Sequence, residues 1–275
     1  SYLQEFIEFC VYTFIVSNML ALGMSTRLAN VIAELRRPLS IFLTLLVNFV
    51  ISPLVAAALA RTMPLQPDHE TGLLALSVAA GGPFLPTIAR AYGGDVTYAA
   101  AITVILIVGS LVLAPFLMSL LLSVIEIDFY NLAKSLVLFM LVPVSVGMMA
   151  SEIGLRNLAS LIVAMKTISN IVLTLLIVML FGFNFQSILD TVGSLAMSSY
   201  ALYLLAIIGI GYFLGAIDVK TQNIFALGAG SRNFPAALIL VGPRADTPGV
   251  TVMLIAALVV NLIALLVLAR VMRRR

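Results

Sequence analysis

The chain alternates between long runs of apolar residues and short polar or Pro/Gly-rich interruptions. Each run approaches the ~20 residues that an α-helix needs to cross the hydrocarbon core of a bilayer. The runs predict nine membrane-spanning helices, at residues 4–24, 39–60, 72–90, 96–124, 130–150, 157–183, 195–216, 221–241 and 247–270. The pattern therefore indicates an all-α polytopic membrane protein, with residues 1–275 forming a single transmembrane unit.

Two of these spans are interrupted near their middle by residues that disfavour a helix. These residues are Gly81, Gly82 and Pro83 in the third span, and Gly228, Gly230 and Pro235 in the eighth. Glycine weakens a helix, and proline removes a backbone donor and clashes with the preceding turn. Unwound backbone at membrane depth survives only inside protein or beside a water-filled cavity. We therefore expect two discontinuous helices that cross each other inside the protein.

The interrupted spans are five spans apart, so they should enter the membrane from opposite sides. This arrangement predicts an inverted repeat that pairs spans 1 to 4 with spans 6 to 9. Interrupted helices at matched positions are typical of secondary transporters with a site near the bilayer midplane. The alternative is that Gly and Pro are simply frequent in membrane helices, which would explain one interruption more readily than two.

Composition and charge fit a membrane protein. The chain is 62% hydrophobic and 10% charged, with a mean hydropathy of +1.17, so it has too few polar side chains to coat a soluble core. Ten Lys and Arg fall on one side of the predicted membrane and three on the other. This asymmetry predicts an integral protein of the plasma (inner) membrane, with the N-terminus outside and the C-terminus in the cytoplasm. The basic residues behind the net charge of +3 are thus accounted for by membrane orientation, so no nucleic-acid partner is expected.

The sequence lacks residues that a metal site or an enzyme inside the membrane would need. Cys10 is the one cysteine and His69 the one histidine, the latter placed in a Pro-rich loop, so we expect no metal site and no cofactor. An intramembrane enzyme would need a catalytic dyad or a metal cluster inside a span, and none is predicted. A channel remains an alternative that would require a symmetric assembly around a pore.

The clearest candidate for chemistry is Arg232, in the middle of the eighth span. A guanidinium at the membrane midplane is costly unless it is paired, and all acidic residues are expected in loops or near span ends. Two partners remain: the carbonyl-rich end of the first half-helix, at 227–230, and an anionic substrate. The alternative is an arginine that snorkels to the interface.

A second polar constellation lies on the sixth span, where Lys166, Asn170 and Thr174 share one helix face. The first span carries Ser17 in a similar stripe with Thr13 and Asn18. These stripes would either face a substrate cavity or form hydrogen bonds between helices, and both interpretations stay open.

Four segments in order along the chain resemble the bile acid:sodium symporter family. They are 21–26 after the first span, Asn48 to Pro53 in the second, Gly81-Gly82 followed by Gly94-Asp95, and 230–233 in the eighth. The resemblance implies a core domain from residues 39–124 and 195–270 that moves against a panel domain from spans 4–24, 130–150 and 157–183. It also implies alternating-access transport of small or amphipathic organic anions. An arsenite-type or auxin-type carrier of related architecture is a further alternative.

The sodium sites that this resemblance implies carry over poorly. The family's shared glutamate falls on Gly228 and its neighbouring glutamine on Arg232, its Ser-Asn pair on Leu85 and Pro86, and a further serine on Ala99. Only Asn48, Thr103 and Asn233 match, which leaves too few oxygen ligands for a hard cation. Sodium is therefore not expected as a partner, with Arg232 replacing the cation, although sodium- or proton-coupled symport remains an alternative.

The resulting prediction is a secondary transporter of an organic anion in a lipid bilayer, with the oligomeric state left open. Its predicted substrate-binding residues are Arg232, Asn233, Asn48, Thr103, Pro83, Lys166, Asn170 and Ser17. The backbone of the crossing is predicted at Gly81, Gly82, Gly228 and Gly230.

Overall fold

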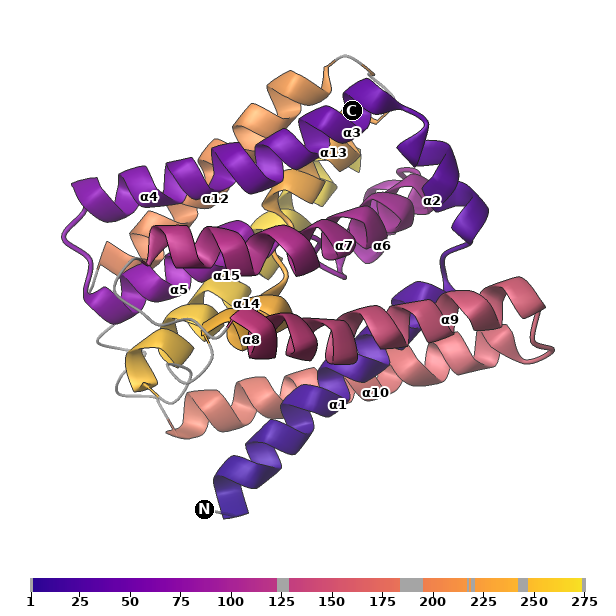
Figure 1. Ribbon diagram of the computed structural model, residues 1–275, viewed down its shortest axis with the longest axis horizontal. Coiled ribbons are helices and arrows are strands. Elements are labelled where there is room, and N and C mark those ends of the chain that lie inside the picture. Colours follow the sequence, from indigo (N-terminus) through magenta and orange to yellow (C-terminus); the bar gives the residue numbers. More distant parts are fainter. Residues whose placement is uncertain are drawn as a thin grey trace.

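The computed structural model describes residues 2–122, 129–183, 195–216, 218, 221–241 and 247–273, and these residues form a helical fold (Figure 1). In chain order the elements are α1 (Tyr2–Met24), α2 (Leu28–Leu35), α3 (Pro38–Leu46), the π-helix η1 (Val47–Ile51), α4 (Ser52–Thr62), α5 (Pro67–Val78), α6 (Leu85–Tyr92), α7 (Val96–Leu121), α8 (Phe129–Leu136), the π-helix η2 (Val137–Leu141), α9 (Val142–Ile153), α10 (Leu158–Phe183), α12 (Leu195–Gly215), α13 (Gln222–Gly230), α14 (Phe234–Val241) and α15 (Pro248–Arg273).

Seven helices or continuous helical runs in the described part of the chain are long and apolar enough to cross a membrane. They are α1, the run from α3 to α4, α7, the run from α8 to α9, α10, α12 and α15. These helices correspond to the seven spans that the sequence predicts to be continuous. The two spans predicted to be interrupted are each divided into short helices, α5 with α6 and α13 with α14.

The helices form two groups, which appear as a lower and an upper layer in Figure 1. In the lower group, α1 packs along both α9 and α10. In the upper group, α12 packs on α13, and α15 packs on α5 and α6. The groups touch where the ring of Phe14 on α1 stacks on Phe84, with centroids 6.4 Å apart, and where α8 packs on α7 and α14.

Two long runs contain a π-helical segment that the sequence analysis does not predict. Each segment, η1 and η2, directly precedes a helix whose second residue is a proline, Pro53 in α4 and Pro143 in α9. Proline cannot donate a backbone hydrogen bond and crowds the turn before it, so the preceding turn widens. η1 places Asn48 on the inner side of its run, where it is buried.

Two local expectations are wrong. The segment from Ser25 to Pro38, expected to be a loop, contains helix α2. Its apolar residues recur every three or four positions, but the helix is far too short to register as a span. His69, expected in a loop, lies in the first turn of α5, which begins at Pro67 because proline suits the first position of a helix.

Candidate functional site

The first interruption separates α5 from α6. α5 ends at Val78, Gly81 adopts a positive φ of 82°, and α6 begins at Leu85. A Cβ atom at Gly81 would lie 2.8 Å from the backbone nitrogen of Ile107 on α7, so the position requires glycine for both its conformation and the close approach. Pro83 is buried within this unwound segment.

The second interruption separates α13 from α14. α13 ends at Gly230, Ser231 is extended, and α14 begins at Phe234 with Pro235 in its first turn. Because proline cannot donate to the preceding turn, the chain leaves the helix before it and starts a new one. Residues 231–233 are consequently free to make hydrogen bonds elsewhere.

The two unwound segments lie side by side and satisfy each other's backbone. Ala80 and Arg232 form an antiparallel bridge. The amide of Gly82 donates to the carbonyl oxygen of Ser231 at 3.0 Å, and the amide of Asn233 donates to the carbonyl oxygen of Ala79 at 2.8 Å. The structure therefore brings together the two interruptions that stand out in the sequence.

Side chains from two neighbouring helices complete the hydrogen bonding of this crossing. Ser110 on α7 accepts from the amide of Ala80 and donates to its carbonyl oxygen, each at 3.0 Å. Asn261 on α15 donates to the carbonyl oxygen of Gly230 at 2.8 Å and to the hydroxyl of Tyr200 at 2.9 Å. Polar side chains on α7 and α15 thus form hydrogen bonds with backbone groups that have no partner within the interrupted helices.

Arg232 occupies the centre of the crossing and is only 1% exposed. Its Nη1 donates to Ser52 Oγ and to the carbonyl oxygen of Ser77, both at 3.2 Å. Its Nη2 donates to Asn48 Oδ1 at 2.6 Å and to the carbonyl oxygen of Ala229. Four oxygens from the second, third and eighth predicted spans therefore surround the guanidinium.

These partners of Arg232 are neutral. Among the residues that the structure describes, no carboxylate forms an ion pair with Arg232. Ala229 belongs to the last turn of α13, where the helix dipole presents partial negative charge to a cation. The ring of Tyr203 adds a further electron-rich surface, with its centroid 6.0 Å from the guanidinium carbon. Arg232 Nε is buried and has no hydrogen-bond partner.

Of the other predicted site residues on the upper helices, Asn48 contacts Arg232 directly, Asn233 bonds within the crossing, and Thr103 bonds within its own helix. Asn233 donates from Nδ2 to the carbonyl oxygen of Gly81 at 3.3 Å and caps α14 through the amide of Ala236. Thr103 is buried, and its hydroxyl donates to Ala99 of its own helix. Asn233 and Thr103 are therefore tied to backbone groups.

The predicted residues on α1 and α10 lie apart from the Arg232 cluster. Lys166 is half-buried on α10, whereas Asn170 is exposed. Ser17 is buried on α1 and donates to the carbonyl oxygen of Thr13 at 2.6 Å. A groove of about 390 Å³ opens between α1 and α10 and includes Ser17 in its lining.

Five residues at the crossing are absent from the sequence-based set: Ser52, Ser77, Tyr203, Ser110 and Asn261. Ser52 also donates to the carbonyl oxygen of Ser77 at 2.6 Å and shares a hydrogen bond of 2.6 Å with the Tyr203 hydroxyl. Asn261 is a polar residue in the middle of an otherwise apolar span, a signal that normally marks a buried partner. Ser52 and Ser77 carried no such signal, because serine is common in membrane helices.

The oxygens around Arg232 are already engaged by its guanidinium. The described residues contain no group of three or more His, Cys, Asp or Glu that could hold a metal. The four acceptors are the oxygens of Asn48, Ser52, Ser77 and Ala229, and residue 228 beside them carries no side chain. A hard cation would have to compete with that fixed charge for the same oxygens.

Comparison with known proteins supports the resemblance seen in the sequence. The chain is 24% identical over 238 residues to the probable chloroplastic sodium/metabolite cotransporter BASS2 of Oryza sativa subsp. japonica, which covers 85% of this chain and 57% of the relative. It is 27% identical over 227 residues to the ileal sodium/bile acid cotransporter of Oryctolagus cuniculus, covering 74% of this chain and 64% of the relative. The chain thus spans about six tenths of the length of these two relatives.

The family model described as the Sodium Bile acid symporter family matches residues 12–191, a region that runs from the middle of α1 past the end of α10. This region includes the first interruption and both π-helical segments. Taken with the paired interruptions, the match establishes that the chain belongs to the Sodium Bile acid symporter family.

Proposed function

We propose that the chain is a secondary transporter that carries a small or amphipathic organic anion by alternating access, without sodium. The observation that carries this proposal is the burial of Arg232 among four oxygens at the crossing. Hydroxyl, amide and carbonyl oxygens are the ligands that a hard cation takes. A tethered guanidinium among them supplies a permanent positive charge where a movable ion would otherwise bind.

The fixed charge has two consequences in this proposal. It holds the two interrupted helices together in every step of the cycle, because its bonds reach α5, η1, α4 and α13 at once. It also gives the region around the crossing a positive potential that favours an anionic substrate and disfavours a free cation. The protein around the site is then shaped by Asn233, Thr103 and Pro83. The opposite side of the substrate path is lined by Lys166, Asn170 and Ser17.

The proposed architecture has nine spans in two inverted repeats. The upper group of helices is the core domain, and α1, the α8 to α9 run and α10 are the panel domain that rocks against it. The aromatic contact between Phe14 and Phe84 lies on this boundary. The basic end of the molecule faces the cytoplasm, as the positive-inside rule requires.

The orientation is tested by cysteine labelling in intact cells, starting from a Cys10→Ser background. An impermeant maleimide should modify Asp68→Cys from outside and should leave Arg36→Cys unmodified until the membrane is opened. The reverse pattern of labelling would overturn the orientation.

Transport is tested by uptake of organic anions into proteoliposomes, with sodium replaced by choline. Wild-type uptake should persist in choline, and Arg232→Gln should abolish it, whereas Arg61→Gln, an exposed arginine at the end of α4, should transport normally. Uptake that collapses when sodium is withdrawn would show that a movable cation is required and would refute the proposal.

A further inference from the structure

Helix α2 joins the two groups of helices and presents three distinct faces. Its inner face packs on α7 through Val31, which is 7% exposed. A second face carries Leu28, Ile32 and Leu35, which are 49%, 41% and 53% exposed. Since these three positions are spaced at four and three residues, they form one continuous apolar stripe. Ala29 and Ala33 are exposed on the remaining side.

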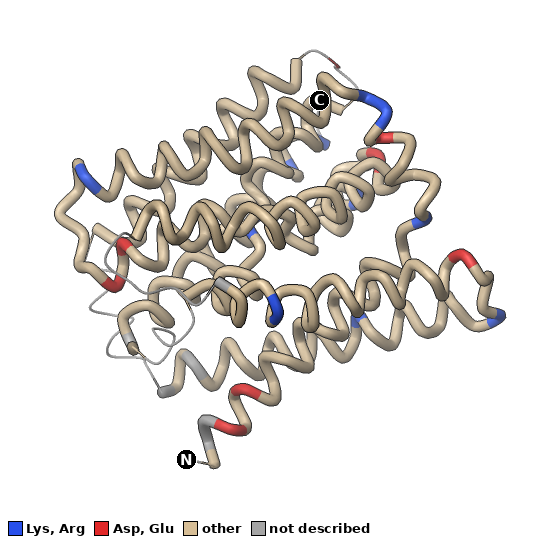
Figure 2. The backbone as a smooth tube through the Cα atoms, in the orientation of Figure 1, with Lys and Arg blue, Asp and Glu red and all other residues tan. Residues whose placement is uncertain are grey.

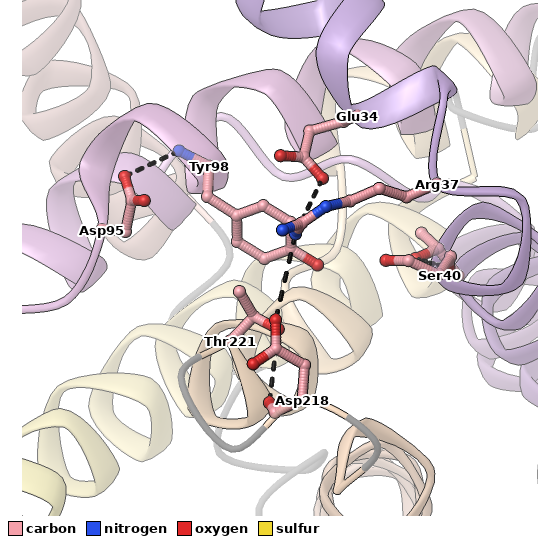
Figure 3. A network of polar contacts seen from close by, with 8 residues as sticks. Glu34, Arg37, Ser40, Asp95, Tyr98, Asp218 and Thr221 are labelled. Atoms are coloured by element: carbon pink, nitrogen blue, oxygen red, sulfur yellow. Dashed lines mark hydrogen bonds and ion pairs between the residues drawn. The ribbon is translucent and has the colours of Figure 1, made fainter.

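The orientation of α2 is fixed at both ends. At its start, the amide of Leu28 donates to Oε1 of Glu152, at the end of α9, at 2.8 Å. At its end, Nη1 of Arg37 forms ion pairs with Oε2 of Glu34 at 3.6 Å and with Oδ2 of Asp218 at 3.9 Å (Figure 3). The exposed stripe is therefore presented by a helix that polar contacts hold in place.

The position of α2 in the fold is the one expected of a helix that lies at the surface of a bilayer. The helix runs across the direction of the long helices at one end of the molecule (Figure 1). Most charged residues gather at the ends of the long helices (Figure 2), which indicates where the hydrocarbon region stops. The exposed side chains of Leu39 and Phe42, in the first turns of α3, continue the apolar surface from α2 into a spanning run.

Two exposed arginines flank the stripe. Arg27 precedes α2 and Arg36 follows it, and neither forms an ion pair with a carboxylate in the described part of the chain. Glu34, the acidic residue of α2, is already paired with Arg37. The exposed surface of α2 therefore combines an apolar stripe with an exposed arginine at each end.

We propose that α2 is an interfacial helix that binds anionic phospholipid. Its apolar stripe lies at the boundary between headgroups and acyl chains, and Arg27 and Arg36 bind the lipid phosphates. A short helix with one apolar face and flanking arginines lies in the plane of the interface, and a guanidinium matches phosphate through paired hydrogen bonds. This inference goes beyond the proposed function and does not depend on it.

The test measures lipid binding to the full chain purified in a neutral detergent. The protein is titrated with phosphatidylglycerol or with phosphatidylcholine, and bound lipid is counted by native mass spectrometry. The wild type should prefer phosphatidylglycerol. Arg27→Gln combined with Arg36→Gln should weaken phosphatidylglycerol binding about thirty-fold, which corresponds to ~1 kcal/mol for each basic residue at a membrane surface.

Two matched variants separate this site from general charge effects. Arg61→Gln combined with Lys134→Gln removes the same charge from exposed residues elsewhere and should bind phosphatidylglycerol like the wild type. Arg27→Lys combined with Arg36→Lys keeps the charge and should lose no more than a few-fold. Equal binding of both lipids by the wild type, unchanged binding by the Arg27 and Arg36 glutamine variant, or an equal loss in the Arg61 and Lys134 control would each overturn the proposal.

Discussion

Sodium should stabilise this protein only after the charge at the crossing has been reversed. In the wild type, the guanidinium of Arg232 holds the oxygens of Asn48, Ser52, Ser77 and Ala229. The double change Gly228→Glu with Arg232→Gln removes that cation and adds a carboxylate four positions earlier in the chain, in the last turn of α13. A Cβ at Gly228 meets only Leu85 Cδ2, at 3.3 Å, so the terminal methyl of a flexible side chain is the obstacle to the larger residue.

The size of the effect follows from Coulomb's law. At an effective dielectric constant near 20, a unit charge about 4 Å away changes the binding free energy of a cation by roughly 4 kcal/mol. This repulsion corresponds to close to a thousandfold weaker affinity for sodium in the wild type. Removing the arginine cancels the repulsion, and the new carboxylate contributes attraction of the same order.

The assay is thermal denaturation of the purified protein in sodium chloride and in choline chloride at equal ionic strength. The wild type and Arg61→Gln should show the same Tm in both salts. If sodium reaches about a hundred times its Kd in the double variant, it adds ~2.7 kcal/mol of stability. For a chain of this size that amounts to a rise in Tm of roughly 5 to 10 °C. A sodium-dependent rise in the wild type equal to that of the double variant would refute the reasoning, and so would an equal response to potassium.

Three further predictions concern stability and are measured by thermal denaturation in detergent. Gly81→Ala should destabilise the protein by at least ~1 to 2 kcal/mol, because Gly81 has a positive φ and lies against the backbone of α7. Gly209 lies in a helix with open space around it, so Gly209→Ala should be neutral or stabilising. Equal effects of the two changes would contradict this account of the interruption. Asn261→Leu should cost ~1 to 3 kcal/mol, since it leaves the Gly230 carbonyl and the Tyr200 hydroxyl without their donor, and an unchanged Tm would mean that this polar contact contributes nothing. Burial raises the pKa of Glu34 more than Arg37 lowers it, so the charged carboxylate costs stability once the pH rises above the pKa of this group in the unfolded chain. Glu34→Gln should therefore raise Tm near pH 8 and leave it nearly unchanged near pH 4. A lower Tm of this variant near pH 8 would show the carboxylate to be stabilising.

The parts of the fold that depend on local chemistry could be predicted from the sequence. Paired glycines and prolines interrupt a helix wherever they occur, so the positions of both interruptions followed from the residues themselves. The apolar runs gave the continuous spans for the same reason. Helix α2 was missed because its eight residues fall well below the length of a span, although its apolar residues repeat with a helical period.

The partners of Arg232 depended on contacts between distant parts of the chain. The sequence indicated the last turn of α13 as one partner, and Ala229 is indeed bonded to the guanidinium. Ser52 and Ser77 could not be identified, since a serine in a membrane helix more often bonds to its own backbone. Their role arises because α4 and α5 place them beside a residue 155 or more positions further along the chain.

The bridge between residues 80 and 232 has a bearing on how this family can diversify. The bonds that join the two interruptions run mainly from main chain to main chain, between Gly82 and Ser231 and between Asn233 and Ala79. Main-chain groups are the same in every amino acid, so these two hydrogen bonds do not depend on side-chain identity, although Gly81 and Gly82 leave no room for a Cβ atom. The side chain at a position such as 232 can then change while the two half-helices keep their positions. The crossing acts as a frame of main-chain bonds within which the chemistry of the side chains is replaceable.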